Sequence, residues 1–148
     1  MDTWKKSFTE KLGRVQSSWV TCFNSALDEM VVPVFGEMSN FLRDNGFATS
    51  TPLNESGRRS YKFELAEDAY LLLIFRSAGM GQFTLSCESV VPGGAPHRRQ
   101  STGRIAELNA AWAREQMQKA LDGFVDLLDA SGTPAPRVTE EEEELTPA

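Results

Sequence analysis

The sequence predicts an α+β fold: a long N-terminal helix, a three-stranded antiparallel meander, a C-terminal helix and a disordered acidic tail. Two stretches, residues 3–45 and 103–130, place apolar side chains at the three- and four-residue spacing of a helix. Between them, three short segments carry the dense or alternating apolar pattern of strands. We expect one domain over residues 1–132 and a tail over residues 133–148.

The N-terminal stretch predicts an unusually long amphipathic helix. Its apolar register repeats every eleven residues, or about 3.67 per turn, so the stripe stays on one face. The stripe comprises Trp4, Phe8, Leu12, Val15, Trp19, Phe23, Ala26, Met30, Val34, Met38 and Phe41. Asp2 or Thr3 can cap its start, and Gly46 is expected to stop it. Pro33 removes one helical hydrogen bond, and we expect a kink because the register continues past it.

The length of the predicted helix suggests that part of its apolar stripe binds another chain. A helix of about forty residues spans ~60 Å, whereas a domain of about 100 residues has a radius of gyration near 13 Å. The helix is therefore expected to extend beyond the domain. This overhang favours a homodimer, in which the extra turns contact a second chain. The expected partner-binding residues are Trp4, Phe8, Leu12 and Trp19. The alternative is that the whole stripe simply covers the core.

Three strands are expected after the helix. Residues 47–57 are rich in turn formers and predict a connection, with a short edge strand at residues 48–51. Residues 61–65 and 83–88 alternate apolar and polar, whereas residues 69–76 are apolar on both faces. Short connections make neighbouring strands antiparallel, so the three form a meander.

The central strand is expected to be buried on both faces. Leu72 and Ile74 lie on one face and Leu73 and Phe75 on the other, and a doubly apolar strand is usually covered on both sides. Either each face packs against one helix, or both helices share a face and a second copy covers the other. The sequence leaves both arrangements open.

The last third of the domain predicts a loop and then a helix. Residues 92–103 are rich in Pro and Gly, and Ser101 or Thr102 can cap a helix over residues 103–130. Gly132 is expected to end this helix. Residues 133–148 carry little to bury, which predicts disorder.

Charge and composition narrow the class of protein. The net charge is −6, of which residues 131–148 carry −4, so the body is nearly balanced. No apolar run is long enough for a membrane span, and the N-terminus lacks the apolar core of a signal peptide. We therefore expect a cytoplasmic protein with no membrane partner, and Cys22 and Cys87 as buried, reduced thiols.

No enzyme motif is present. The glycine pairs lack the Lys-Ser/Thr of a P-loop, and no G-x-S-x-G occurs. His97 is the only histidine, and with two cysteines it cannot complete a four-ligand zinc site. We expect no catalytic residues, no metal and no cofactor.

The basic residues provide an alternative function, an anion- or nucleic-acid-binding regulator. The candidate anion-binding residues are Arg58, Arg59, His97, Arg98, Arg99 and Arg104. The two groups are expected at opposite ends of the meander, and nucleic acid is not favoured because the chain is acidic. Glu140 to Glu144 can screen the basic loop. That loop is expected about 40 Å from the root of the tail, at the other end of the last helix, so the tail would more easily reach a partner's loop.

The small, acidic helix–sheet–helix layout resembles dimeric secretion chaperones, a resemblance of layout carried by no motif. Together with the overlong helix, it favours a non-catalytic protein-binding or assembly module. We expect a homodimer that acts like a chaperone or adaptor, with a protein partner whose identity the sequence does not reveal.

Overall fold

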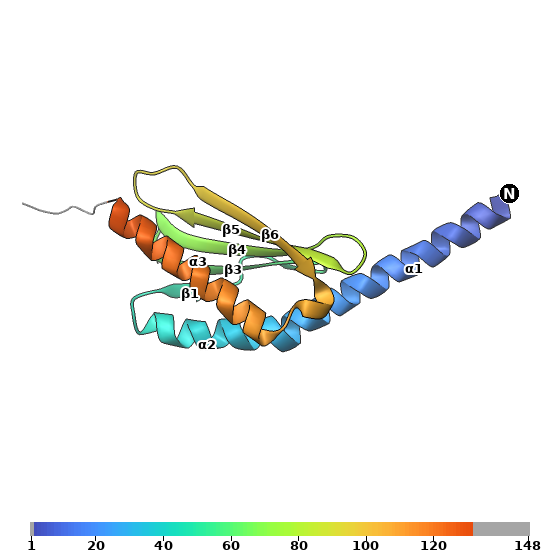
Figure 1. Ribbon diagram of the computed structural model, residues 1–148, viewed down its shortest axis with the longest axis horizontal. Coiled ribbons are helices and arrows are strands. Elements are labelled where there is room, and N and C mark those ends of the chain that lie inside the picture. Colours follow the sequence, from blue (N-terminus) through green and yellow to red (C-terminus); the bar gives the residue numbers. More distant parts are fainter. Residues whose placement is uncertain (1, 132–148) are drawn as a thin grey trace, which may run out of the picture.

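The computed structural model describes residues 2–131 and confirms the α+β class (Figure 1). The predicted tail at residues 133–148 lies outside the described residues. The helical elements are α1 (Asp2–Ala26), η1 (Leu27–Val31), α2 (Val32–Arg43), η2 (Ile105–Glu107) and α3 (Ala110–Ala130). The strands are β1 (Ala48–Ser50), β2 (Asn54–Glu55), β3 (Arg58–Ala66), β4 (Ala69–Ser77), β5 (Gln82–Val90) and β6 (His97–Arg104).

The sheet is antiparallel and has six strands rather than the predicted three. Its order is β1-β3-β4-β5-β6, and β2 pairs with β3. The predicted meander corresponds to β3, β4 and β5, and the predicted edge strand corresponds to β1. β4 lies at the centre of the order, as its apolar sequence predicted.

The largest correction concerns residues 97–104, which were predicted to end a loop and begin the last helix but form β6. This strand pairs with β5 from Ser89↔His97 to Gln82↔Arg104. Its sequence, His-Arg-Arg-Gln-Ser-Thr-Gly-Arg, carries no apolar alternation because it is an exposed edge strand. Gly103 fits here because a Cβ would stand only 3.0 Å from the Phe83 ring.

Because β6 includes Ser101 and Thr102, neither residue caps the last helix. The chain leaves β6 through the short 3₁₀ turn η2, which buries Ile105, and α3 begins later than predicted. Its N-cap is Asn109, whose side-chain oxygen accepts a hydrogen bond from the Trp112 backbone N–H at 2.9 Å.

Pro33 leaves the first helix continuous but bent, as the apolar register predicted. The turn before it, η1, is a single π-helical turn, in which the Val32 N–H donates to the Leu27 carbonyl. Pro33 then stands in the first turn of α2, where its missing N–H costs least. Figure 1 shows α1 and α2 meeting at an angle at this point.

All helices pack on one face of the sheet, which we call the covered face. One buried cluster joins Phe23 and Leu27 from the first helical segments with Leu73 on β4 and Met117 on α3. The opposite, open face has no covering element within the described residues. Of the two arrangements considered from sequence, the structure therefore has both helices on the same side.

Within one chain, two of the four expected core positions on β4 are only partly covered. Leu73 and Phe75 are fully buried on the covered face. Leu72 and Ile74 point to the open face and are only half-buried. They share that face with the half-buried Tyr70, and polar side chains on β3, β5 and β6 surround them.

The cysteines also differ from expectation. Cys22 is exposed on α1, and Cys87 is half-buried on β5; neither forms a disulfide. Burial raises the pKa of the Cys87 thiol, and the nearby Arg99 guanidinium partly offsets that rise. Cys87 lies on the covered face, because it pairs with Leu73 of β4 and with Arg99 of β6.

A buried phenol in the core predicts alkaline sensitivity. Burial raises the pKa of Tyr61, an effect that Arg59 partly offsets, and the Tyr61 hydroxyl has no hydrogen-bond partner among the described residues. In the unfolded chain the Tyr61 phenol ionises at pH ~10, before the same group in the folded protein. The free energy of unfolding is therefore fully present below that pH and is lost as the pH rises through the folded-state pKa of Tyr61.

We therefore expect Tyr61→Phe to flatten this alkaline loss while changing neutral-pH stability little. The measurement is the free energy of unfolding by urea between pH 7 and 11, for parent and variant. Identical slopes above pH 10 would contradict the assignment of the loss to Tyr61.

Candidate functional site

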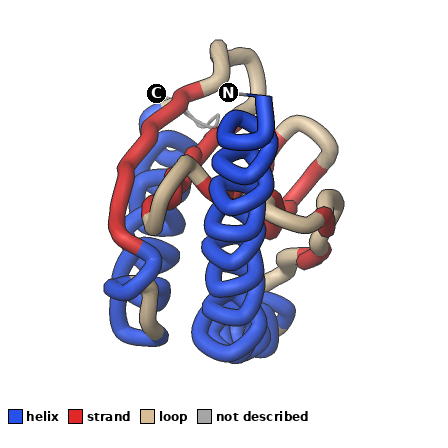
Figure 2. The backbone as a smooth tube through the Cα atoms, turned by 90° about the vertical axis from the view of Figure 1, so that its right-hand side faces the viewer, coloured by secondary structure: helices blue, strands red, loops and turns tan. Residues whose placement is uncertain are grey.

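The N-terminal part of α1 projects beyond the rest of the molecule (Figure 1), and from that end α1 lies in front of the other elements (Figure 2). We call residues 2–18, which precede the first residue packed against the core, the arm. None of them belongs to the buried core or to the partly buried residues packed against it. Yet Trp4, Phe8 and Val15 are large apolar residues, with 60%, 51% and 46% of their surfaces exposed. The predicted overhang is therefore present, and it carries an apolar stripe into solvent.

The stripe on the arm is locally ordered. The Trp4 and Phe8 rings stack with centroids 5.2 Å apart and an interplanar angle of 24°. Leu12 follows one turn later and is half-buried. Aromatic side chains on a projecting helix are the kind of residue that dominates binding energy at protein interfaces.

Trp19 differs from the other predicted partner-binding residues. It packs against the core at the root of the arm, and a Cβ on Gly81 would come within 3.2 Å of its ring. Gly81 also has a positive φ of 73°, so a side chain there would be strained as well as crowded. Trp19 therefore joins α1 to the β4–β5 turn rather than extending the free stripe.

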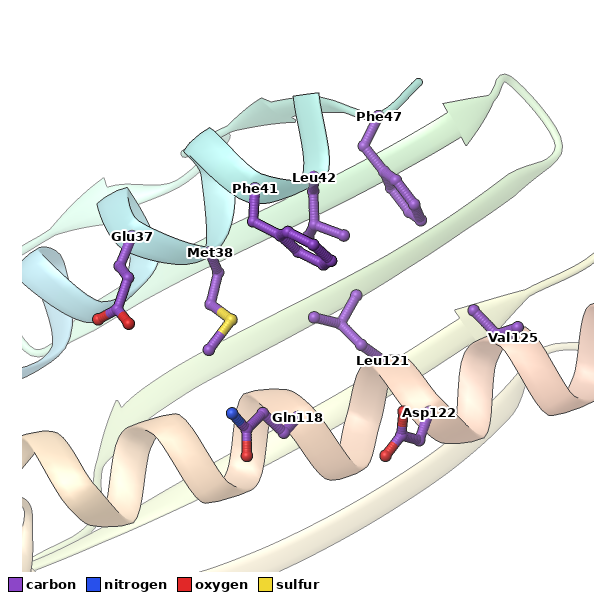
Figure 3. A pocket seen from close by; sticks show the side chains of 9 residues that line it. All are labelled: Glu37, Met38, Phe41, Leu42, Phe47, Gln118, Leu121, Asp122 and Val125. Atoms are coloured by element: carbon purple, nitrogen blue, oxygen red, sulfur yellow. The ribbon is translucent and has the colours of Figure 1, made fainter. Parts of the chain in front are cut away.

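A second apolar surface lies between α2 and α3, and we call it the groove (Figure 3). It has a volume of about 610 Å³. Its lining residues are Glu37, Met38, Phe41, Leu42, Phe47, Gln118, Leu121, Asp122 and Val125.

Two of these apolar side chains lie largely in solvent. Phe41 on α2 is 65% exposed and Val125 on α3 is 50% exposed. Leu42 is buried and Phe47 is half-buried, so the apolar surface continues into the groove. An ion pair between Glu37 and Arg114, 2.9 Å long, ties α2 to α3 beside the groove.

The structure separates the predicted anion-binding residues. Arg58 and Arg59 lie on β3, which β4 and β5 separate from β6, the strand that carries the other four residues. Arg59 is buried, and its guanidinium donates to Asp28 at 2.7 Å and to Asn54 at 3.1 Å. Within one chain, Arg59 is therefore engaged in hydrogen bonds that hold β3 to β2 and to η1.

The β6 residues divide further between the two faces. Arg98 pairs with Glu88 at 2.8 Å on the open face, whereas Arg99 lies on the covered face next to Cys87. Arg76, which the sequence analysis did not single out, stands directly opposite Arg58. This pair could be found only from the register between β3 and β4, because its two residues lie far apart in the sequence.

The position of β6 also corrects the expected distance between the basic segment and the tail. His97 and Arg99 line a small pocket with Ala120, Gly123 and Leu127 of α3. α3 follows β6 and runs back along it, so the start of β6, with His97 and Arg99, lies beside the C-terminal half of α3. The root of the tail is thus near its own basic segment, not at the far end of the helix.

Comparison with protein-family models, curated proteins and solved structures finds no match for this chain. None of the helices among residues 2–131 is long and apolar enough to cross a membrane. Within the same residues, no three His, Cys, Asp or Glu side chains gather closely enough to hold a metal ion.

Proposed function

We propose that this protein is a non-catalytic protein-binding or assembly module, homodimeric and similar in role to a chaperone or adaptor. The arm is its binding element. The observation that carries the proposal is the exposure of Trp4, Phe8 and Val15 on a helix that projects past the folded body.

Physical chemistry supports binding over a purely structural role for the arm. Burying a side chain such as Phe contributes roughly 1.5–3 kcal/mol relative to leaving it in water. The fold gains little of this energy because the arm packs on none of the core. A complex in which a partner covers the stripe gains this burial energy instead. Amphipathic helices that enter apolar grooves bind in this way.

Replacing Phe8 and Leu12 together by Ser is expected to increase the monomer fraction relative to the parent. The change removes two large side chains from the stripe but touches no core residue. Sedimentation velocity over a range of micromolar concentrations measures the shift. The double variant Lys6→Ser/Glu10→Ser is a matched control, because it alters the same turns on the opposite face and leaves the net charge unchanged.

Two outcomes would contradict the proposal. A parent that is monomeric at high micromolar concentration leaves the arm without the partner proposed here. Equal dissociation of the control and the stripe variant would mean that lost helicity, not a lost apolar contact, explains the result.

A further inference from the structure

We infer that the groove between α2 and α3 is the receptor for the arm of a second copy of this chain. The inference rests on the proposed function and adds to it the site where the arm binds. It brings together two exposed apolar surfaces of the described helices, the arm on α1 and the groove between α2 and α3.

The apolar patterns of the two surfaces fit one another. The arm presents Trp4, Phe8, Leu12 and Val15 at the spacing by which a helix lays anchors along a groove. The groove offers apolar side chains from both helices, with Phe41 on one side and Val125 on the other (Figure 3). Its volume of about 610 Å³ is within the range of pockets that enclose whole ligands.

The charges beside the two surfaces are complementary. At about 100° per residue, Lys5 and Lys11 fall on the two sides of the arm's stripe, each roughly 60° from its centre. The groove has a carboxylate on each wall, Glu37 on α2 and Asp122 on α3. Within residues 2–131, no ion pair is formed by Lys5, Lys11 or Asp122. Glu37 already forms an ion pair with Arg114. An arm lying in the groove therefore brings lysines to carboxylates on both sides.

An arm that lies in the groove must come from another chain. The arm is a direct continuation of α1, whose next turns are anchored by the fully buried Phe23 and then, in η1, by Leu27. The arm leaves the body at one end, whereas the helical turns that line the groove, in the C-terminal parts of α2 and α3, lie toward the other end (Figure 1). Each chain thus carries one arm and one groove, and reciprocal exchange about a two-fold axis closes a dimer.

Site-specific photocrosslinking tests this placement directly. The full-length chain carries p-benzoylphenylalanine at Phe8, a substitution that keeps an aromatic group on the stripe. Irradiation is expected to give a covalent dimer whose crosslinked peptides contain residues 37–47 or 118–125 of the other copy. The same group at Glu10, on the opposite face of the same turns, is the matched control and is expected to give little covalent dimer.

A charge exchange provides an independent measurement. Asp122→Lys is expected to weaken self-association about 5-fold, the scale of one exposed ion pair made repulsive. Adding Lys5→Glu or Lys11→Glu, whichever lysine lies against α3, is expected to recover most of that loss. Asp126→Lys is the control for a change of net charge, since Asp126 is exposed on α3 outside the groove.

The outcomes separate this inference from the proposed function. Crosslinks from Phe8 to α1 or to the open face of the other copy would overturn the groove as receptor and leave the arm as the binding element. Equal crosslinking from Glu10, or failure of both lysine variants to recover association, would also overturn the groove. A parent that neither self-associates nor crosslinks would overturn both.

Discussion

Replacing Leu73 by Ala is expected to lower the free energy of unfolding by about 2–5 kcal/mol, the cost of emptying a packed leucine site. Leu73 is fully buried at the centre of the covered face, where aromatic residues of β3 and β4 surround it. The change removes apolar surface and leaves a cavity between the sheet and the helices. Urea denaturation monitored by tryptophan fluorescence measures the loss.

Leu72→Ala is the matched control, because it makes the same change at the next residue of the same strand. Leu72 points to the open face and is half-buried, so its loss is expected to be well below that of Leu73→Ala. A loss under half a kcal/mol at Leu73 would show that the covered face is not packed as described. Equal losses at both positions would show that something also covers the open face.

Replacing Asp28 by Ala is expected to destabilise the fold by about 1–3 kcal/mol, because the buried Arg59 guanidinium then loses its charged acceptor. The Arg59 side chain is only 10% exposed, whereas Asp28 is 64% exposed, and their atoms are 2.7 Å apart. Water can partly replace the lost carboxylate, which keeps the cost below that of breaking a fully buried pair.

Two comparison variants isolate this interaction. Glu29→Ala changes the neighbouring exposed acid and is expected to stay within about 0.5 kcal/mol of the parent. Asp28→Ala combined with Arg59→Met removes both charges, and is expected to cost less than Asp28→Ala alone. Thermal or urea unfolding of the four proteins provides the comparison. A double variant less stable than the single one would show that Arg59 stabilises the fold through other contacts.

Sequence patterns predicted the parts of the fold that bury apolar side chains. The eleven-residue register predicted the first helix through Pro33, and alternation predicted β3, β4 and β5. β6 could not be found in this way, since its His97 to Arg104 sequence buries almost nothing and is held by pairing with β5. Its pairing depends on register across the sheet, which a local pattern does not contain.

The candidate site was predictable only in part, for the same physical reason. Trp4, Phe8 and Leu12 could be selected because the helix is longer than the domain it serves. The groove could not, since its walls come from α2 and α3, which lie far apart in the chain. Phe41 shares the register of Phe8 and Trp19, and only the position of α3 shows that it stays exposed.

The separation of the arm from the core has a consequence for how the protein can vary. The buried core and the residues packed against it begin at Trp19. The arm extends the same helix beyond them, and a helix that continues from packed turns needs no nucleus of its own. If the arm binds a partner as proposed, substitutions or insertions before Trp19 are expected to alter association while leaving the body intact. A single proteolytic cut in the arm would then remove the proposed binding element and leave the core residues in place, so association would be lost irreversibly without unfolding.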